Sequence, residues 1–96
     1  MDSSIGNLVK VVIHAYKVGR KIYHRGDFVV SENMTLELVL KTIGEQIGEP
    51  LLELVKDKSE YTIVVFNDKA VEFEEERNRI VTNDDTLKLL PQVVGG

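Results

Sequence analysis

Cysteine is absent from this chain of 96 residues. Disulfide bonds, thiolate metal sites and cysteine nucleophiles are therefore excluded from its chemistry. Long apolar runs are also missing, because no stretch approaches the roughly 20 residues that cross a bilayer. The opening MDSSIGN lacks the basic and apolar regions of a signal peptide. We therefore expect a cytoplasmic protein that has no membrane partner.

Neither cationic nor metal-ligating side chains are concentrated in the sequence. The 12 Lys and Arg residues are scattered among 16 Asp and Glu residues, for a net charge of −4, so we expect no nucleic-acid partner. His14 and His24 have no further ligands at the spacing of a metal site. The run Glu74, Glu75 and Glu76 is typical of a solvated segment rather than a catalytic site. We predict no metal and no bound cofactor.

The composition is that of one soluble globular domain, with 43% hydrophobic and 29% charged residues. Residues 8–18 and 21–30 are β-rich, and Gly19 and Arg20 interrupt them, which predicts a hairpin. Gly26 and Asp27 predict a bulge in its second strand. The first strand alternates with period two. Its two faces carry Val9, Val11, Ile13 and Ala15 on one side, and Lys10, Val12, His14 and Tyr16 on the other.

A helix is predicted after Thr35, because the apolar spacing changes there to that of a helical stripe. The stripe contains Leu36, Val39, Leu40, Ile43 and Ile47. Thr35 is placed to cap the first turn, and Gly48 is placed to end the helix. Residues 50–55 predict a further short helical turn.

The second half predicts a third strand over residues 61–66, a tight turn at Asn67 and Asp68, and a last strand over residues 86–90. Both faces of the third strand are apolar, so the pattern does not assign its inward side. Residues 72–85, EFEEERNRIVTNDD, are interpreted as a long solvated connection. The last strand alternates, with Leu87 and Leu89 on one side, and Pro91 is expected to stop its ladder pairing.

This order of elements predicts an α+β fold of the β-grasp (ubiquitin-like) type. One main helix crosses one face of a mixed sheet of four to five strands, and the last strand pairs parallel to the first. We expect a β-grasp domain over residues 1–90 and a flexible C-terminal tail over residues 91–96.

The tail ends in Gly95 and Gly96, which expose backbone without side chains and can enter a narrow channel. The carboxylate of Gly96 is ionised near neutral pH and can attack the α-phosphate of ATP. Pro91, Val93 and Val94 favour extended backbone, which lowers the entropy lost when the tail docks.

The segment VTNDDTLKLLPQVVGG resembles the end of the MoaD/ThiS family of ubiquitin-like sulfur carriers, which includes the molybdopterin-synthase small subunit and related archaeal small modifier proteins. The segments VKVVIHA, MTLELVLKTIG and VVFNDKAV are similar to the family's first strand, helix and later strand with its asparagine turn. Molybdopterin-type members usually have two adjacent prolines before the last glycines, whereas here Gln92 follows Pro91.

The resemblance implies a carrier protein rather than an enzyme, possessing no cofactor of its own. A ubiquitin-activating-type adenylyltransferase would use ATP to adenylate Gly96, which would then become a thiocarboxylate. The sulfur would pass to a molybdopterin-synthase large subunit or another acceptor enzyme, for molybdopterin synthesis or a related thiolation. Gly95, Pro91 and their neighbours Gln92, Val93 and Val94 would dock in the partner.

The outward residues of the first and last strands form a second candidate site. A β-grasp sheet places these strands side by side, so an apolar patch beside the tail would suit partner docking. Its members are Val12, His14, Tyr16, Lys88 and Leu90. Scattered surface apolar residues are an equally open interpretation.

Two rival functions also remain open at this stage. The same activated Gly96 could form an isopeptide bond with target-protein lysines, which would make the chain a ubiquitin-like modifier. Alternatively, the chain could be a noncatalytic β-grasp interaction module in which the glycines have no role.

Overall fold

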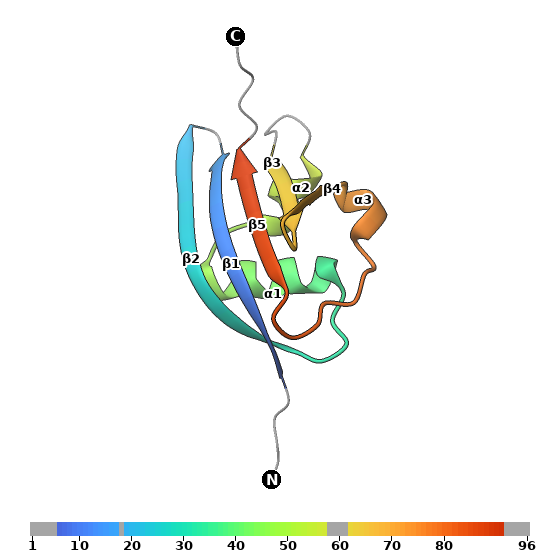
Figure 1. Ribbon diagram of the computed structural model, residues 1–96. Coiled ribbons are helices and arrows are strands. Elements are labelled where there is room, and N and C mark those ends of the chain that lie inside the picture. The colour runs from blue at the N-terminus through green and yellow to red at the C-terminus, as the bar shows by residue number, and fades with distance from the viewer. Residues whose placement is uncertain (1–5, 18, 58–61, 92–96) are drawn as a thin grey trace.

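The computed structural model describes residues 6–17, 19–57 and 62–91. Five strands form one mixed sheet in the order β2-β1-β5-β3-β4, with α1 crossing behind it (Figure 1). The strands are β1 (Gly6–Lys17), β2 (Arg20–Ser31), β3 (Thr62–Phe66), β4 (Lys69–Val71) and β5 (Thr86–Pro91). This arrangement confirms the predicted β-grasp fold.

The first two strands form a long antiparallel hairpin whose register runs from Lys17 opposite Arg20 to Gly6 opposite Ser31. Gly19 adopts a φ of 75° in the turn, a left-handed conformation that glycine takes without steric cost. The predicted bulge at Gly26 and Asp27 is wrong, because every β2 residue has one partner in β1. Gly26 pairs with Val11 in a regular ladder, with no additional residue in β2.

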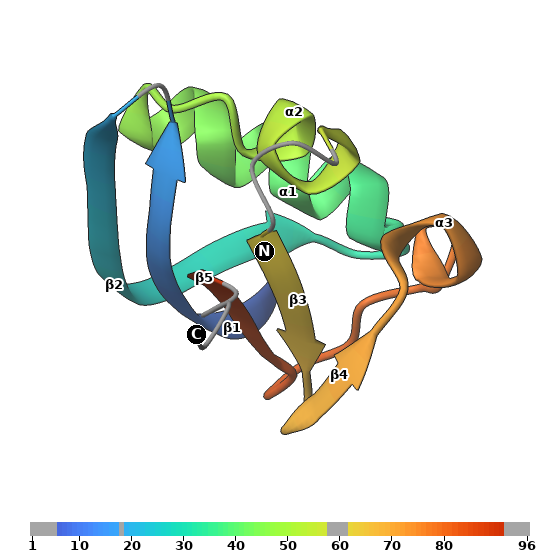
Figure 2. The same cartoon turned by 90° about the horizontal axis from the view of Figure 1, so that it is seen from above.

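The described residues form three helices beside the sheet: α1 (Leu36–Ile47), α2 (Leu51–Lys56) and α3 (Phe73–Glu76). The Thr35 hydroxyl accepts a hydrogen bond from the Leu38 amide at 3.2 Å, and Gly48 ends α1 with a φ of 74°. Both predicted caps are therefore confirmed. Seen from above, α1 and α2 lie together over one face of the sheet (Figure 2).

The core lies between that face and the two longer helices. The predicted inward residues of β1 and β5 are all buried, as are four of the five residues of the helix stripe, and Ile47 packs half-buried against them. In β3, Val64 and Phe66 are buried, which assigns the inward side that the sequence pattern leaves open. Burying this many aliphatic side chains supplies the main driving force of folding.

Residues 72–85 are not the purely solvated connection that their charge indicates. Phe73 opens α3 and is buried, as is Val81. The amides of Leu36 and Glu37 donate to the carbonyls of Arg79 and Arg77, at 2.8 and 3.1 Å. The segment therefore satisfies amides that the first turn of α1 cannot pair internally.

The Arg77 side chain fastens the same segment to α1. Its guanidinium contacts the Glu37 carboxylate at 2.8 Å and the Glu74 carboxylate at 2.9 Å. These two charge-assisted contacts hold the charged segment 72–85 against α1, so it is not a mobile loop.

Candidate functional site

The strand that precedes the tail, β5, lies at the centre of the sheet. The last strand, β5, pairs parallel with β1 on one side and antiparallel with β3 on the other. Pro91 lies opposite Thr62, so the strand contains one residue more than the predicted range 86–90, and Pro91 is its last described residue. A proline at a strand end costs little, because its missing N–H matters only where the ladder needs a donor.

The reactive part of the predicted site lies outside the described residues. This applies to Gln92, Val93, Val94, Gly95 and Gly96, whose roles stay predictions. The structure does describe Pro91, the residue to which they are attached. Pro91 ends β5, and β5 is paired with a strand on each side. A segment attached there starts from a rigid part of the fold.

The second predicted site lies on the sheet surface opposite α1 and α2, which we call the outer face. It is formed by the strand residues that alternate with the buried ones, because successive side chains of a strand point to opposite faces of the sheet. On β1, β2 and β5 these residues are Leu8, Lys10, Val12, His14, Tyr16, Lys21, Tyr23, Arg25, Asp27, Val29, Thr86, Lys88 and Leu90.

All five predicted docking residues meet on this outer face. Val12 pairs directly with Lys88 across β1 and β5, and Leu90 lies one position beyond the buried Leu89. The side chains of Val12, His14, Lys88 and Leu90 are half-buried, whereas Tyr16 is 42% exposed. The resulting surface is partly apolar and continuous with the strand that precedes the tail.

An aromatic group joins β1 to β2 on the same face. The ring of His14 lies 5.8 Å from that of Tyr16 and 6.0 Å from that of Tyr23, within the range of stabilising ring contacts. Tyr23 is 56% exposed and does not belong to the predicted set. The hairpin register could have identified it, because a turn at Gly19 places Tyr23 opposite His14.

Cationic side chains also gather here, and the sequence interpretation missed their grouping. Arg25 lies opposite Val12 on β2, while Lys88 lies opposite Val12 on β5. Lys10 occupies the next outward position of β1. These three are scattered along the chain at positions 10, 25 and 88, so only strand pairing unites them.

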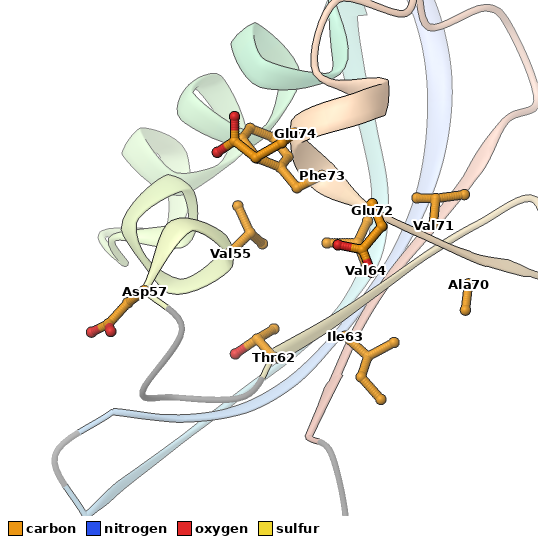
Figure 3. A pocket seen from close by; sticks show the side chains of 10 residues that line it. All are labelled: Val55, Asp57, Thr62, Ile63, Val64, Ala70, Val71, Glu72, Phe73 and Glu74. Carbon is orange, nitrogen blue, oxygen red and sulfur yellow. The ribbon is translucent and has the colours of Figure 1, made fainter.

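A separate cleft of about 360 Å³ opens between α2, β3, β4 and α3 (Figure 3). Its apolar lining is formed by Val55, Ile63, Val64, Ala70, Val71 and Phe73. The carboxylates of Asp57, Glu72 and Glu74 lie around it. The Thr62 hydroxyl at this cleft is buried and has no hydrogen-bond partner among the described residues. None of the predicted site residues that the structure describes lines the cleft.

Two groups of paired charges with shifted pKa values lie away from the outer face. A hydrogen bond from Arg20 lowers the pKa of Glu49, and the same contact at 2.7 Å raises the pKa of Arg20. The pKa of Arg77 is raised by its hydrogen bonds to Glu37 and Glu74. In both groups the hydrogen bonds favour the charged forms of the side chains and stabilise contacts between separate segments of the fold.

No group of three or more potential ligands in the described part of the chain is arranged to hold a metal ion. Among the described helices, none has the length and apolar character that crossing a membrane requires. The predictions of no metal, no bound cofactor and a cytoplasmic location remain predictions.

Neither a protein-family model nor a curated protein sequence matches this chain significantly. Solved structures do match. Small archaeal modifier protein 1 from Methanosarcina acetivorans aligns over 96% of this chain and 99% of its own, with 19% identity and a TM-score of 0.52. A ubiquitin from Caldiarchaeum subterraneum aligns over 95% and 99%, with 18% identity and a TM-score of 0.50. At these identities the likeness establishes a ubiquitin-like fold.

Proposed function

We propose that this chain is a ubiquitin-like carrier protein whose working group is the C-terminal carboxylate of Gly96. The observation that carries the proposal is that β5 lies between two paired strands and a diglycine occupies the fourth and fifth positions after its end. Five extended residues reach roughly 16 Å, at about 3.3 Å per residue. That length lets the carboxylate enter another enzyme's site while the folded body stays outside.

The first chemical step is adenylation by a partner enzyme of the ubiquitin-activating type. A carboxylate oxygen of Gly96 attacks the α-phosphorus of ATP, the bond to the β-phosphate breaks, and pyrophosphate leaves. The acyl adenylate that forms is a reactive mixed anhydride. The chain is then a co-substrate, and ATP binds to the partner rather than to it.

The favoured second step makes the chain a sulfur carrier, in line with the family resemblance of its tail. A hydrosulfide sulfur attacks the carbonyl carbon of the adenylate, the bond to AMP breaks, and a thiocarboxylate remains. Sulfur then passes to an acceptor enzyme, for which a molybdopterin-synthase large subunit is the candidate partner.

A second candidate is conjugation to target proteins, which the likeness to a small archaeal modifier protein favours. There a lysine amine attacks the same activated carbonyl and releases AMP, leaving an isopeptide bond. Both routes share the adenylate, so they diverge only in the nucleophile. A search of cellular lysines for the C-terminal remnant of this chain distinguishes them.

The proposed docking contacts combine the tail with the outer face. The proposed tail contacts are Leu90, Pro91, Gln92, Val93 and Val94. The proposed contacts of the outer face are Val12, His14, Tyr16 and Lys88, and Val12 pairs with Lys88 on the strand that precedes the tail. Partly apolar surface on the strand that precedes the reactive end suits an enzyme that must hold the body while it processes the tail.

The test is intact-mass spectrometry of the full chain after incubation with ATP, a hydrosulfide source and the activating enzyme of the same organism. We expect one terminal oxygen to be replaced by sulfur. Removing Gly96 should abolish this exchange without changing the melting temperature. Gly26→Ala is the matched control, since open space surrounds Gly26. An unchanged mass under all cognate pairings contradicts the sulfur-carrier route.

A further inference from the structure

The outer face holds a shallow depression of about 390 Å³ that lies over β1 between β2 and β5. Its centre is a row of three paired residues, Arg25, Val12 and Lys88. The neighbouring row consists of Asp27, Lys10 and Thr86. Adjacent strands lie about 4.8 Å apart, so the two cations of the first row stand on either side of a half-buried valine.

The charge of this face is opposite to that of the whole chain. The outward positions of β1, β2 and β5 hold Lys10, Lys21, Arg25 and Lys88 against the single carboxylate of Asp27, which gives 4 − 1 = +3. The complete chain carries −4. Positive charge is therefore concentrated on this set of outward residues, and the rest of the chain carries the acidic excess, −4 − 3 = −7.

The cations of the depression are available to a ligand. Within residues 6–17, 19–57 and 62–91, Lys10 and Arg25 make no ion pair or side-chain hydrogen bond. Lys88 contacts the Asp68 carboxylate at 3.9 Å, and the Asp68 side chain is 84% exposed. An exposed pair at that distance contributes little energy, so Lys88 can exchange it for another carboxylate.

Apolar side chains lie directly next to these cations. The row that follows Arg25 and Val12 consists of Tyr23 and His14, and Leu90 extends it on β5. On β3, Ile63 pairs with Leu90 and Val65 pairs with Lys88. A ligand that covers both rows must offer carboxylates and apolar groups a few ångströms apart.

We infer that the outer face binds a short acidic segment of a partner protein, with its carboxylates on Arg25, Lys88 and Lys10 and an apolar side chain on Val12. This inference names the chemistry of the partner in the proposed function and rests on that function. A long polyanion such as nucleic acid fits less well, because it would extend past the cluster onto the acidic remainder of the molecule. A short segment stays within the positive patch.

The probe for this inference is the acetylated and amidated peptide EDLIDLE, titrated into the full-length ¹⁵N-labelled protein. We expect amide shifts confined to β1, β2 and β5, and a dissociation constant that rises as salt increases from about 20 to about 300 mM. The isosteric neutral peptide QNLINLQ should bind at least about tenfold more weakly. Equal binding of the two peptides overturns the inference.

Charge reversal identifies the residues. Arg25→Glu combined with Lys88→Glu should weaken peptide binding at least about tenfold, because both contacts become repulsive. Lys41→Glu is the matched control, since Lys41 is an exposed lysine on α1. The amide spectrum of each variant verifies the fold. An equal loss in the Lys41 variant, or shifts confined to the helices, contradicts the assignment.

Two further titrations compare other anionic partners. Tighter binding of a single-stranded oligonucleotide, or of vesicles containing phosphatidylserine, would overturn the acidic-segment inference in favour of a phosphate-bearing partner. The peptide titration requires no tail chemistry. Failure of the peptide to bind while Gly96 is still thiocarboxylated would refute only this inference, and binding by a chain with an inert Gly96 would refute only the proposed function.

Discussion

Thr62 lies directly opposite Pro91 in the antiparallel ladder between β3 and β5. The same threonine lines the cleft between α2, β3, β4 and α3, where its buried hydroxyl meets no hydrogen-bond partner in the described part of the chain. The cleft therefore begins about one strand spacing, roughly 4.8 Å, from Pro91, the last described residue of β5. The end of β5 thus has the outer face on one side of the sheet and the cleft beside the next strand.

Consecutive leucines on β5 should differ sharply in their contribution to stability. Leu89 is 0% exposed, so Leu89→Ala should lower the free energy of unfolding by about 2–5 kcal/mol through lost burial and a new cavity. Leu90 lies on the opposite side of the strand, and Leu90→Ala should cost less than about 1 kcal/mol. Urea unfolding of both variants measures the difference. Similar losses would mean that the assignment of the two faces is wrong.

Asn67 should contribute through its side chain as well as its backbone. Its Oδ1 accepts from the Thr86 amide at 2.8 Å, and its Nδ2 donates to Asp85 at 3.0 Å, with a φ of 52°. Asn67→Gly keeps the left-handed backbone but loses these bonds, at a cost of about 1 kcal/mol. Asn67→Ala also strains the backbone and should cost about 1 kcal/mol more. Thermal unfolding ranks them, and an alanine variant as stable as the glycine variant contradicts this account.

Gly44→Ala tests tertiary packing against helix propensity. Propensity alone favours alanine inside α1 by about 1 kcal/mol. A Cβ at Gly44, however, would lie 2.6 Å from the backbone oxygen of Glu49, which cannot move aside without shifting the chain that leads to α2. We expect a net loss of about 1–3 kcal/mol in chemical denaturation.

Gly26→Ala provides the matched comparison for this prediction. A Cβ at Gly26 would meet nothing within 4 Å, so the change should be neutral or stabilising by up to about 1 kcal/mol. Destabilisation at Gly26 together with tolerance at Gly44 would reverse the expected order and contradict the packing described for α1.

The Arg20–Glu49 pair should make stability depend on pH in acid. Hydrogen bonding to Arg20 lowers the pKa of Glu49 in the folded state, so the unfolded carboxyl binds a proton more readily than the folded one. The stabilisation is therefore present above the ordinary glutamate pKa of about 4.3 and is lost as the pH falls through the lowered folded value. Glu49→Gln should be less stable than the parent near neutrality and should approach it in acid.

Melting curves of the parent, Glu49→Gln and Arg20→Gln across that pH range measure the effect. The Arg20 side chain is 57% exposed, so added salt should reduce the difference at neutral pH. A stability gap that persists unchanged below the folded pKa would show that the carboxylate charge is not its cause.

The sequence pattern predicts most elements because each depends on local periodicity. Alternation assigns Val9, Val11, Ile13 and Ala15 to the core, and all four are buried. The change to helical spacing at Leu36 identifies α1, and Thr35 and Gly48 mark its ends. These features need no partner segment to be recognised, since the caps and the apolar stripe are encoded within one turn or two of chain.

The sequence pattern gives a wrong prediction where the structure of a segment depends on contacts with residues far away in the chain. Phe73 and Val81 are isolated apolar residues in a highly charged stretch, so their pattern has no period that predicts burial. Their positions follow from the carbonyls of Arg77 and Arg79, which accept amides of α1 some 40 residues earlier. The predicted bulge at Gly26 is wrong for a similar reason. Regular pairing along the whole hairpin outweighs the conformational freedom of one glycine.

The sequence by itself determined the β-grasp fold, the inward faces of β1 and β5, and the presence of the diglycine at positions 95 and 96. Only the tertiary structure decided that Arg25, Val12 and Lys88 form one row, and that Pro91 is still paired within the sheet. The physical reason is that periodicity acts through neighbours along the chain, whereas a surface is created by strand registers. Those registers bring together residues whose positions in the sequence are unrelated.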